Sequence, residues 1–200
     1  MRRLVLATRN AGKVRELASI LGPLGVDVVS LADYPGLPEI PEEGETFEAN
    51  AVFKAREVAR LTGETALADD SGLDVDALGG APGVHSARFA GEPKDDAANN
   101  AKLLRLLEGI PPEKRTARFR CVVALATPEG EVYTAEGVSE GVILDKPRGE
   151  NGFGYDPLFY VPSLGRTFAE LDMDAKNRIS HRGRALAQVA GLVRRVLGDR

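Results

Sequence analysis

Residues 116–143 read TARFRCVVALATPEGEVYTAEGVSEGVI, two runs of mostly apolar and β-branched residues on either side of a short turn. The turn, Pro128-Glu129-Gly130, favours a hairpin between strands at 116–127 and 131–143. Strands joined by so short a turn run antiparallel. The stretches around this hairpin instead alternate short apolar strands with helices, a pattern typical of parallel pairing. The sequence therefore predicts an α/β fold in which helices flank a mixed central β-sheet with a long antiparallel hairpin.

Apolar spacing and cap residues predict the remaining elements. Thr46 is a suitable N-cap for a helix that ends before Gly63, and residues 72–78 are expected to continue the third strand or to pair with it. The last helix would end in a solvated turn with Arg194, Arg195 and Arg200. The other predicted elements are strands at 4–7, 26–31, 65–68 and 158–161 and helices at about 14–21, 47–62, 96–108 and 180–197.

Composition limits the classes of protein to consider. The chain has 200 residues, of which 43% are hydrophobic and 28% charged, enough for a single domain with a substantial core. A net charge of −4 argues against a nucleic-acid partner, and the longest apolar run, Cys121 to Ala126, is too short to span a membrane. The single cysteine excludes an internal disulfide, and we expect no secretory signal, because no apolar stretch long enough for one precedes Leu4. We therefore expect a cytoplasmic globular protein with one domain over residues 1–200, in two lobes around a central cleft.

The first candidate site is the turn Thr8-Arg9-Asn10-Ala11-Gly12-Lys13, between the first strand and the first helix. The N-terminus of a helix offers unpaired N–H groups and the positive end of a dipole, which suit a phosphate. The lysine adds a charge that reaches the same anion. The spacing is not that of a P-loop, and a capped turn with a surface lysine is the alternative.

The second candidate follows a buried strand and reads Asp69-Asp70-Ser71-Gly72. Adjacent residues of a strand face opposite sides, so the two carboxylates cannot both enter one site if the strand stays regular. Acids at the carboxyl end of a buried strand lie where α/β sheets place ligands. The alternative is a strand that ends in a polar turn, since these residue types favour turns.

An acidic loop at residues 39–45 is the third candidate. If one of its glutamates meets Asp70, the two carboxylates supply part of a Mg²⁺ site, with water and substrate phosphates completing it. In the next helix, Asn50 and Lys54 are four residues apart and share one face. Taken alone, the loop is simply solvated and Lys54 is a surface residue.

Two further segments suit a heterocycle and its substituents. In Gly152-Phe153-Gly154-Tyr155-Asp156, the glycines permit close approach and the aromatic ring offers a stacking surface, unless Phe153 packs in the core. Lys176 and the run Ser180-His181-Arg182 combine cations with an imidazole, although a helix cap at Ser180 explains part of this pattern. We expect His85 to be structural and Cys121 to be an inert packed thiol.

The order of these motifs along the chain resembles the inosine/xanthosine triphosphate pyrophosphatase family, which acts on non-standard purine nucleoside triphosphates. The resemblance extends from Leu4 to Leu197. The motifs that carry it are Thr8-Arg9-Asn10-x-x-Lys13, Glu48-x-Asn50-Ala51 with Lys54-Ala55, Asp69-Asp70-Ser71-Gly72-Leu73, Ala77-Leu78-Gly79-Gly80-Ala81-Pro82-Gly83, Phe153-Gly154-Tyr155-Asp156-Pro157 and Ser180-His181-Arg182.

The resemblance implies a homodimeric, Mg²⁺-dependent enzyme that hydrolyses ITP, dITP and XTP to the monophosphate and pyrophosphate. It also implies an elongated ITPase-like fold with two lobes. Asp70 would accept a proton and share the metal with Glu42, for which Glu43 is an alternative, and Lys54 would assist catalysis. The residues expected to contact the nucleotide are Thr8, Arg9, Asn10, Ala11, Gly12, Lys13, Ser71, Phe153, Gly154, Tyr155, Asp156, Lys176, His181 and Arg182.

Two other functions remain open on these residues. One is a Maf-type pyrophosphatase for modified pyrimidine nucleotides, against which the segments at 153–156 and 180–182 argue. The other is a nucleotide-binding module without catalysis, which gains nothing from an additional proton acceptor beside an acidic loop.

Overall fold

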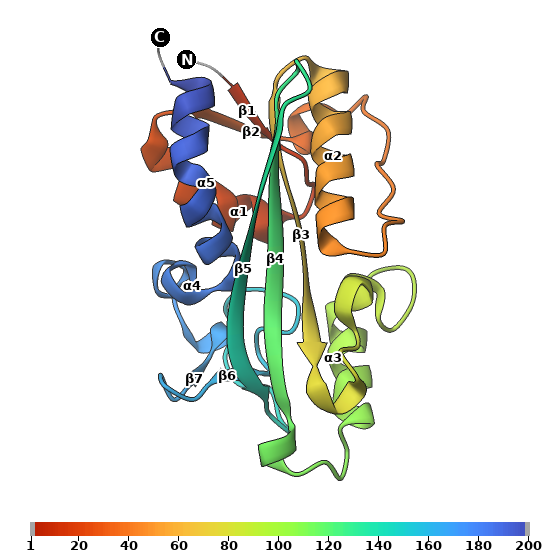
Figure 1. Ribbon diagram of the computed structural model, residues 1–200. Helices are drawn as coiled ribbons and strands as arrows, with labels where there is room; N and C mark the ends of the chain where they lie inside the picture. Colours follow the sequence, from red (N-terminus) through yellow and green to blue (C-terminus); the bar gives the residue numbers. More distant parts are fainter. Residues whose placement is uncertain (1–2, 199–200) are drawn as a thin grey trace. The chain divides into compact units, whose positions relative to one another are not determined.

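The computed structural model describes residues 3–198, and the strands of that range form one mixed sheet (Figure 1). The strands are β1 (Arg3–Leu6), β2 (Asp27–Ser30), β3 (Thr65–Val75), β4 (Thr116–Ala126), β5 (Val132–Ile143), β6 (Phe159–Val161) and β7 (Arg166–Thr167). Within the described residues their order is β2-β1-β3-β4-β5-β6-β7. β1 pairs in parallel with β2 and β3, whereas β6 pairs in antiparallel fashion with β5 and β7. The predicted α/β fold with a mixed sheet is therefore confirmed.

The described helices are α1 (Ala11–Leu21), α2 (Phe47–Thr62), α3 (Asp96–Leu106), α4 (Met173–Ile179) and α5 (His181–Leu197). The predicted limits of α2 are confirmed, because Thr46 caps its start and Gly63, at φ 69°, ends it in the left-handed region. The sequence reading missed α4 and β7, which are too short to show a periodicity. Arg194 and Arg195 are exposed in the last turn of α5, while Arg200 lies outside the described residues.

One predicted boundary needs correction. The sequence predicted a strand at 65–68 and left open whether residues 72–78 continue it or pair with it. β3 runs from Thr65 through Asp69 and Asp70 to Val75, so the continuation is confirmed as far as Val75, while residues 76–78 form a 3-10 turn. Acidic residues are unusual inside a buried strand. They are accommodated here because charged or amide side chains meet both carboxylates.

The chain folds into two compact units. One contains the described residues up to Asp70, residues 121–137 and those from Arg182 onward, and the other contains residues 71–120 and 138–181. No helix in the part of the chain described, residues 3–198, is long and apolar enough to cross a membrane.

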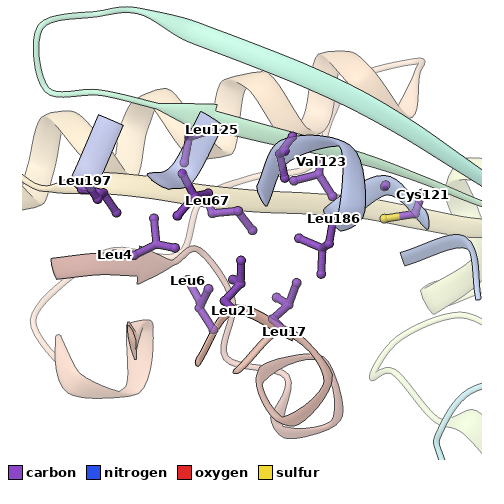
Figure 2. Close-up of a cluster of buried hydrophobic side chains, with 13 residues drawn as sticks. Leu4, Leu6, Leu17, Leu21, Leu67, Cys121, Val123, Leu125, Leu186 and Leu197 are labelled. Atoms are coloured by element: carbon purple, nitrogen blue, oxygen red, sulfur yellow. The ribbon is translucent and has the colours of Figure 1, made fainter. Parts of the chain in front are cut away.

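In the first unit, α1 and α5 pack against one face of the strands (Figure 2). Leu4 and Leu6 of β1 point into this cluster, and Val5 between them is also fully buried, so both faces of the strand are covered. The cluster consists of Leu4, Leu6, Leu17, Leu21, Leu67, Cys121, Val123, Leu125, Ala185, Leu186, Val189, Val193 and Leu197. This packing fixes the carboxyl end of β1 and the start of α1, between which the first candidate turn lies.

The second unit has its own core, in which α3 and the ends of β3, β4 and β5 surround an aromatic group. The rings of Phe119 and Phe159 lie 4.5 Å apart, and those of Phe159 and Phe168 lie 4.8 Å apart. Tyr155 also belongs to this core and donates its hydroxyl hydrogen to the Ser86 carbonyl at 2.6 Å. The C-terminal part of the segment at 152–156 is therefore held in place by the packing of Tyr155 in this core.

Candidate functional site

The turn between β1 and α1 is organised by its own side chains. Asn10 caps the helix, since its Oδ1 accepts a hydrogen bond from the Lys13 backbone N–H at 3.1 Å. The Asn10 N–H donates to Thr8 Oγ1 at 3.1 Å, and the Arg9 guanidinium donates to the Leu37 carbonyl at 2.9 Å. A preformed turn thus leads into an 11-residue helix whose first N–H groups can receive a phosphate.

The rest of the turn completes this arrangement. Ala11 is exposed at the first position of α1, and Gly12 is buried at the second. The Lys13 ammonium extends toward β3, where its Nζ lies 3.2 Å from Asp69 Oδ2. A positive charge is therefore held between the helix N-terminus and the two aspartates of β3.

Asp69 belongs to a buried group of charges. Its Oδ2 accepts a hydrogen bond from Arg182 Nε at 3.1 Å, and Arg182 Nη1 donates to Glu16 Oε2 at 2.5 Å. Burial alone would raise the pKa of the Asp69 carboxyl, but the charges of Lys13 and Arg182 outweigh it and hold that pKa below its usual range. Asp69 is therefore ionised and committed to these cations.

Asp70 faces other partners, as the alternation of a strand requires. Its Oδ2 accepts a hydrogen bond from Asn50 Nδ2 at 2.9 Å. Burial raises the pKa of the Asp70 carboxyl, while the charges of Lys13 and Lys54 and the bond from Asn50 act to lower it. The nearby protein charges thus offset only part of the cost of burying the negative charge of Asp70. A further cation beside this carboxylate would therefore stabilise it.

Asn50 connects Asp70 with the acidic loop. Its Oδ1 accepts from the Gly44 N–H at 2.7 Å, and its Nδ2 donates to the Gly44 carbonyl at 3.3 Å as well as to Asp70. One buried side chain therefore satisfies both backbone groups of a loop residue and orients a carboxylate. A Cβ at Gly44 would lie 2.6 Å from Asn50 Oδ1, so the loop can approach this closely only with glycine at that position.

The lysine of α2 binds the same loop. Lys54 is buried and its ammonium forms an ion pair with Glu42. Glu42 and the neighbouring Glu43 are both exposed. Lys54 is therefore not the surface residue of the alternative interpretation, because the helix turns it inward, toward the loop and Asp70.

The oxygen ligands around Asp70 are compatible with Mg²⁺. No group of three or more His, Cys, Asp or Glu side chains within residues 3–198 could hold a metal by itself. Magnesium does not need such a cage, because it commonly takes one or two carboxylates and completes its shell with water and phosphate oxygens. Lys54 acts on the Asp70 carboxyl and pairs with Glu42, so the chemistry of these two carboxylates fits such a partial set.

In the second unit, the loop at 152–156 is held from within. Asp156 is buried, accepts from the Phe153 N–H at 3.1 Å and receives the Lys176 ammonium at 2.5 Å. The same ammonium lies 4.8 Å from the centre of the half-buried Phe153 ring. Gly152, at φ 73°, has no room for a Cβ, which would overlap with Asp156 Oδ2.

The remaining predicted residues differ in burial and in the protein groups that they contact. Ser71 is half-buried in β3, while His181 is buried and its ring stacks on Phe119 at 4.6 Å. The Arg182 side chain is 1% exposed and bound to Asp69 and Glu16, as described above. The side chains of these two basic residues therefore have protein partners already, and Tyr155 likewise contributes to the core.

Sequence reasoning did not select Glu16 and did not assign Asn50 a role. Glu16 could have been detected because it lies beside Leu17 on the apolar side of α1. An acid at such a position needs a buried partner. For Asn50 the sequence showed only that it lies four residues before Lys54, which does not reveal its contacts with the loop or with Asp70. As expected, Cys121 is buried, and burial raises the pKa of its thiol, whereas His85 is exposed.

A cavity of about 720 Å³ lies elsewhere in the first unit. Its lining includes Arg3 and Thr65, the first residues of β1 and β3, together with Tyr133 and Arg195. The candidate turn follows the opposite, carboxyl end of β1. This cavity is therefore distinct from the candidate site, and none of the residues expected to contact the nucleotide lines it.

Known proteins are similar to this chain over nearly its whole length. The model of the Ham1 family matches residues 4–192. A dITP/XTP pyrophosphatase of Desulforamulus reducens is 64% identical and covers 97% of this chain and 96% of its own length. One of Geobacter sulfurreducens is 60% identical, with 94% of each chain covered.

Solved structures agree with these relatives. A HAM1 protein from Coxiella burnetii has a TM-score of 0.86 and 46% identity, covering 96% of this chain and 98% of its own. A nucleoside-triphosphatase / dITP/XTP pyrophosphatase from Mycobacterium abscessus has a TM-score of 0.74 and 51% identity, covering 94% and 98% respectively.

Proposed function

Since this chain belongs to the Ham1 family, we propose that it is a nucleoside triphosphate pyrophosphatase that hydrolyses ITP, dITP and XTP to the monophosphate and pyrophosphate. The relatives named dITP/XTP pyrophosphatase match nearly its whole length. Such an activity removes deaminated purines from the nucleotide pool.

The observation that carries this proposal is the convergence of three segments on Asp70. The charge of Lys13, from the turn after β1, and that of Lys54, from α2, both act on its carboxyl group. Asn50 joins it to the acidic loop. A helix N-terminus, two cations and a carboxylate beside an acidic loop together suit a triphosphate and the hydrolysis of its anhydride bond.

The cofactor we propose is Mg²⁺, held by Asp70 and by Glu42 or Glu43. When bound, the ion supplies positive charge against the phosphates and polarises the attacking water. Asp70 positions that water and accepts its proton as the oxygen attacks the α-phosphorus. The N–H groups of the turn and Lys13 hold the phosphate chain, and Lys13 and Lys54 stabilise the charge on the leaving pyrophosphate.

We assign the base and sugar to Ser71, Phe153, Gly154, Tyr155, Asp156, Lys176, His181 and Arg182, with the Phe153 ring as the stacking surface. Hypoxanthine and xanthine carry a 6-oxo group where adenine carries a 6-amino group, so N–H donors of the protein favour them. An unpaired 2-amino group would disfavour guanine, since burying such a group without a partner costs binding. Arg182 can take part only by exchanging or sharing its carboxylate partners.

Release of pyrophosphate from ITP, XTP, dUTP, ATP and GTP, each with and without a chelator, tests the proposal. We expect turnover of ITP and XTP, much weaker turnover of ATP and GTP, and loss of activity with the chelator. Preference for dUTP would indicate a pyrimidine nucleotide pyrophosphatase instead. Binding of ITP without any pyrophosphate release would indicate a non-catalytic module.

We further propose that the enzyme is a cytoplasmic homodimer. The resemblance described in the sequence analysis implies the dimer, and the composition favours the location. The dimer is tested by measuring the mass of the protein in solution with light scattering, where a mass of a single chain at micromolar concentration would contradict it.

A further inference from the structure

The N-terminal half of α3 binds the loop that carries Phe153. Asp96 Oδ2 accepts a hydrogen bond from the Gly154 N–H at 2.9 Å, and Asn100 Nδ2 donates to the Gly154 carbonyl at 3.0 Å. Asp96 and Asn100 are four residues apart and therefore lie on one face of the helix. Both backbone groups of one loop glycine are thus held by a single helix face.

These contacts complete the restraint on Phe153. Its own N–H donates to Asp156 Oδ2 at 3.1 Å, and the next N–H along the chain, that of Gly154, donates to Asp96. A carboxylate therefore fixes the peptide group on each side of the ring-bearing residue. Gly154 has a φ of 60°, a left-handed conformation from which a glycine readily departs when its hydrogen bonds are lost.

We infer that Asp96 and Asn100 are positioning residues that set the orientation of the Phe153 ring and thereby the affinity for the purine base. This inference rests on the proposed function, in which that ring stacks on the base. Asp96 and Asn100 belong to the second unit, whereas the phosphate-binding turn and Asp70 belong to the first. They act on binding, and the hydrolytic step does not depend on them.

The physical basis is preorganisation. A ring whose backbone is fixed before the substrate arrives loses little conformational freedom on binding. If the peptide between Phe153 and Gly154 can rotate, that freedom must be lost each time the base binds. The cost appears in KM, because the same restraint is present in the ground state and in the transition state.

Steady-state kinetics with ITP test the inference in four variants. In Asp96→Ala the Gly154 N–H loses its acceptor, so we expect KM to rise about tenfold while kcat stays within about twofold. Asn100→Ala should raise KM in the same way. Asp96→Asn should keep a KM close to that of the unaltered protein, because its amide oxygen can accept the same hydrogen bond.

Asp95→Ala is the matched control. Asp95 caps α3 by accepting from the Ala98 N–H at 3.0 Å and makes no contact with Gly154 that the structure records. Its loss weakens the helix end without removing either restraint on the loop, so KM should not change. An equal rise of KM in Asp95→Ala and Asp96→Ala would overturn the inference in favour of a general weakening of α3.

Two further measurements test whether the rise of KM in Asp96→Ala is caused by the Phe153 ring. Inhibition by inorganic tripolyphosphate, which has no base, should be the same in Asp96→Ala and in the unaltered protein. Asp96→Ala should add nothing to the KM of Phe153→Ala, because the ring is already absent. Weaker inhibition by tripolyphosphate, or an additive effect in the double variant, would contradict a role through the ring.

The failure of this inference can be told from the failure of the proposed function. If the unaltered protein releases no pyrophosphate from ITP, the proposed function fails. In that case amide hydrogen exchange at Gly154 still reports on the restraint, and faster exchange in Asp96→Ala but not in Asp96→Asn is the expected result. Unchanged exchange in Asp96→Ala, or an unchanged KM in a folded and active variant, would overturn the inference.

Discussion

Two neighbouring aspartates of β3 have pKa values shifted in opposite directions because they face different partners. Burial tends to raise the pKa of both carboxyls, but only Asp69 has Arg182 and Lys13 close enough to reverse the shift. Asp70 has an amide, that of Asn50, as its hydrogen-bond donor. Asp69 is therefore suited to holding the fold and Asp70 to meeting a ligand.

Replacing Asp70 by asparagine should leave the fold intact and remove most of the activity. The amide has the same shape and needs no counter-charge at this buried position, so the melting temperature should stay close to that of the unaltered protein. Loss of a proton acceptor lowers kcat by about 10²–10⁴-fold. Pyrophosphate release from saturating ITP measures this, and a kcat like that of the unaltered protein would remove Asp70 from the catalytic role.

Asp69→Ala should instead act on stability. It leaves the buried Arg182 and Lys13 charges with one carboxylate fewer, and breaking such a buried pair costs about 3–5 kcal/mol. The free energy of unfolding in urea measures this effect. Asp27→Ala is the control, because the pair of Asp27 with Arg3 is exposed and its loss should change stability little. Equal effects of the two substitutions would contradict the structural role of the buried group.

At the scale of single elements, α2 is the clearest case of local control. The Thr46 hydroxyl accepts from the Ala49 N–H at 3.1 Å, and Gly63 terminates the helix at a positive φ. The helix carries Asn50 and Lys54 on its buried side. Its register therefore decides where the two side chains that meet the acidic loop and Asp70 are placed.

Removal of the cap in Thr46→Ala should destabilise the protein by about 1 kcal/mol, since one backbone N–H loses its acceptor. Thr46→Asn, which can cap equally well, should be close to neutral. Urea denaturation distinguishes the two variants. A Thr46→Ala protein as stable as the unaltered one would show that tertiary packing alone holds the start of α2.

The loop at 152–156 is an element without regular structure, and its proposed role is tested by Phe153→Ala. Stacking contributes to binding before and during reaction alike, so KM for ITP should rise about tenfold while kcat changes little. Initial rates over a range of ITP concentrations measure this. An unchanged KM would show that the ring serves packing alone.

At the scale of the whole molecule, each of the two units has its own apolar core. The residues proposed for phosphate and metal belong to the first unit. Those proposed for the base, apart from Arg182, belong to the second. Binding of the nucleotide should stabilise the folded protein.

Thermal unfolding with a non-hydrolysable ITP analogue tests this expectation. A ligand present at about 100 times its Kd stabilises the folded state by about 2.7 kcal/mol, so the melting temperature should rise clearly when Mg²⁺ and the analogue are both present. A chelator should abolish most of the rise, because the phosphates then lose their counter-charge. A full shift in the presence of the chelator would contradict the proposed metal requirement.

The sequence by itself determined the mixed α/β class, the hairpin, the limits of α2 and the family, because these depend on periodicity, caps and short motifs that are local along the chain. It could not determine the partners of the buried charges. Asp69 meets Arg182 across 113 positions and Asn50 meets Asp70 across 20, and no local pattern encodes such pairs. Only the tertiary structure placed an amide on one aspartate and a guanidinium on its neighbour, and only it brought Asp96 to Gly154. Side-chain charges acquire their surroundings when distant segments pack, and those surroundings decide which acid is structural and which can react.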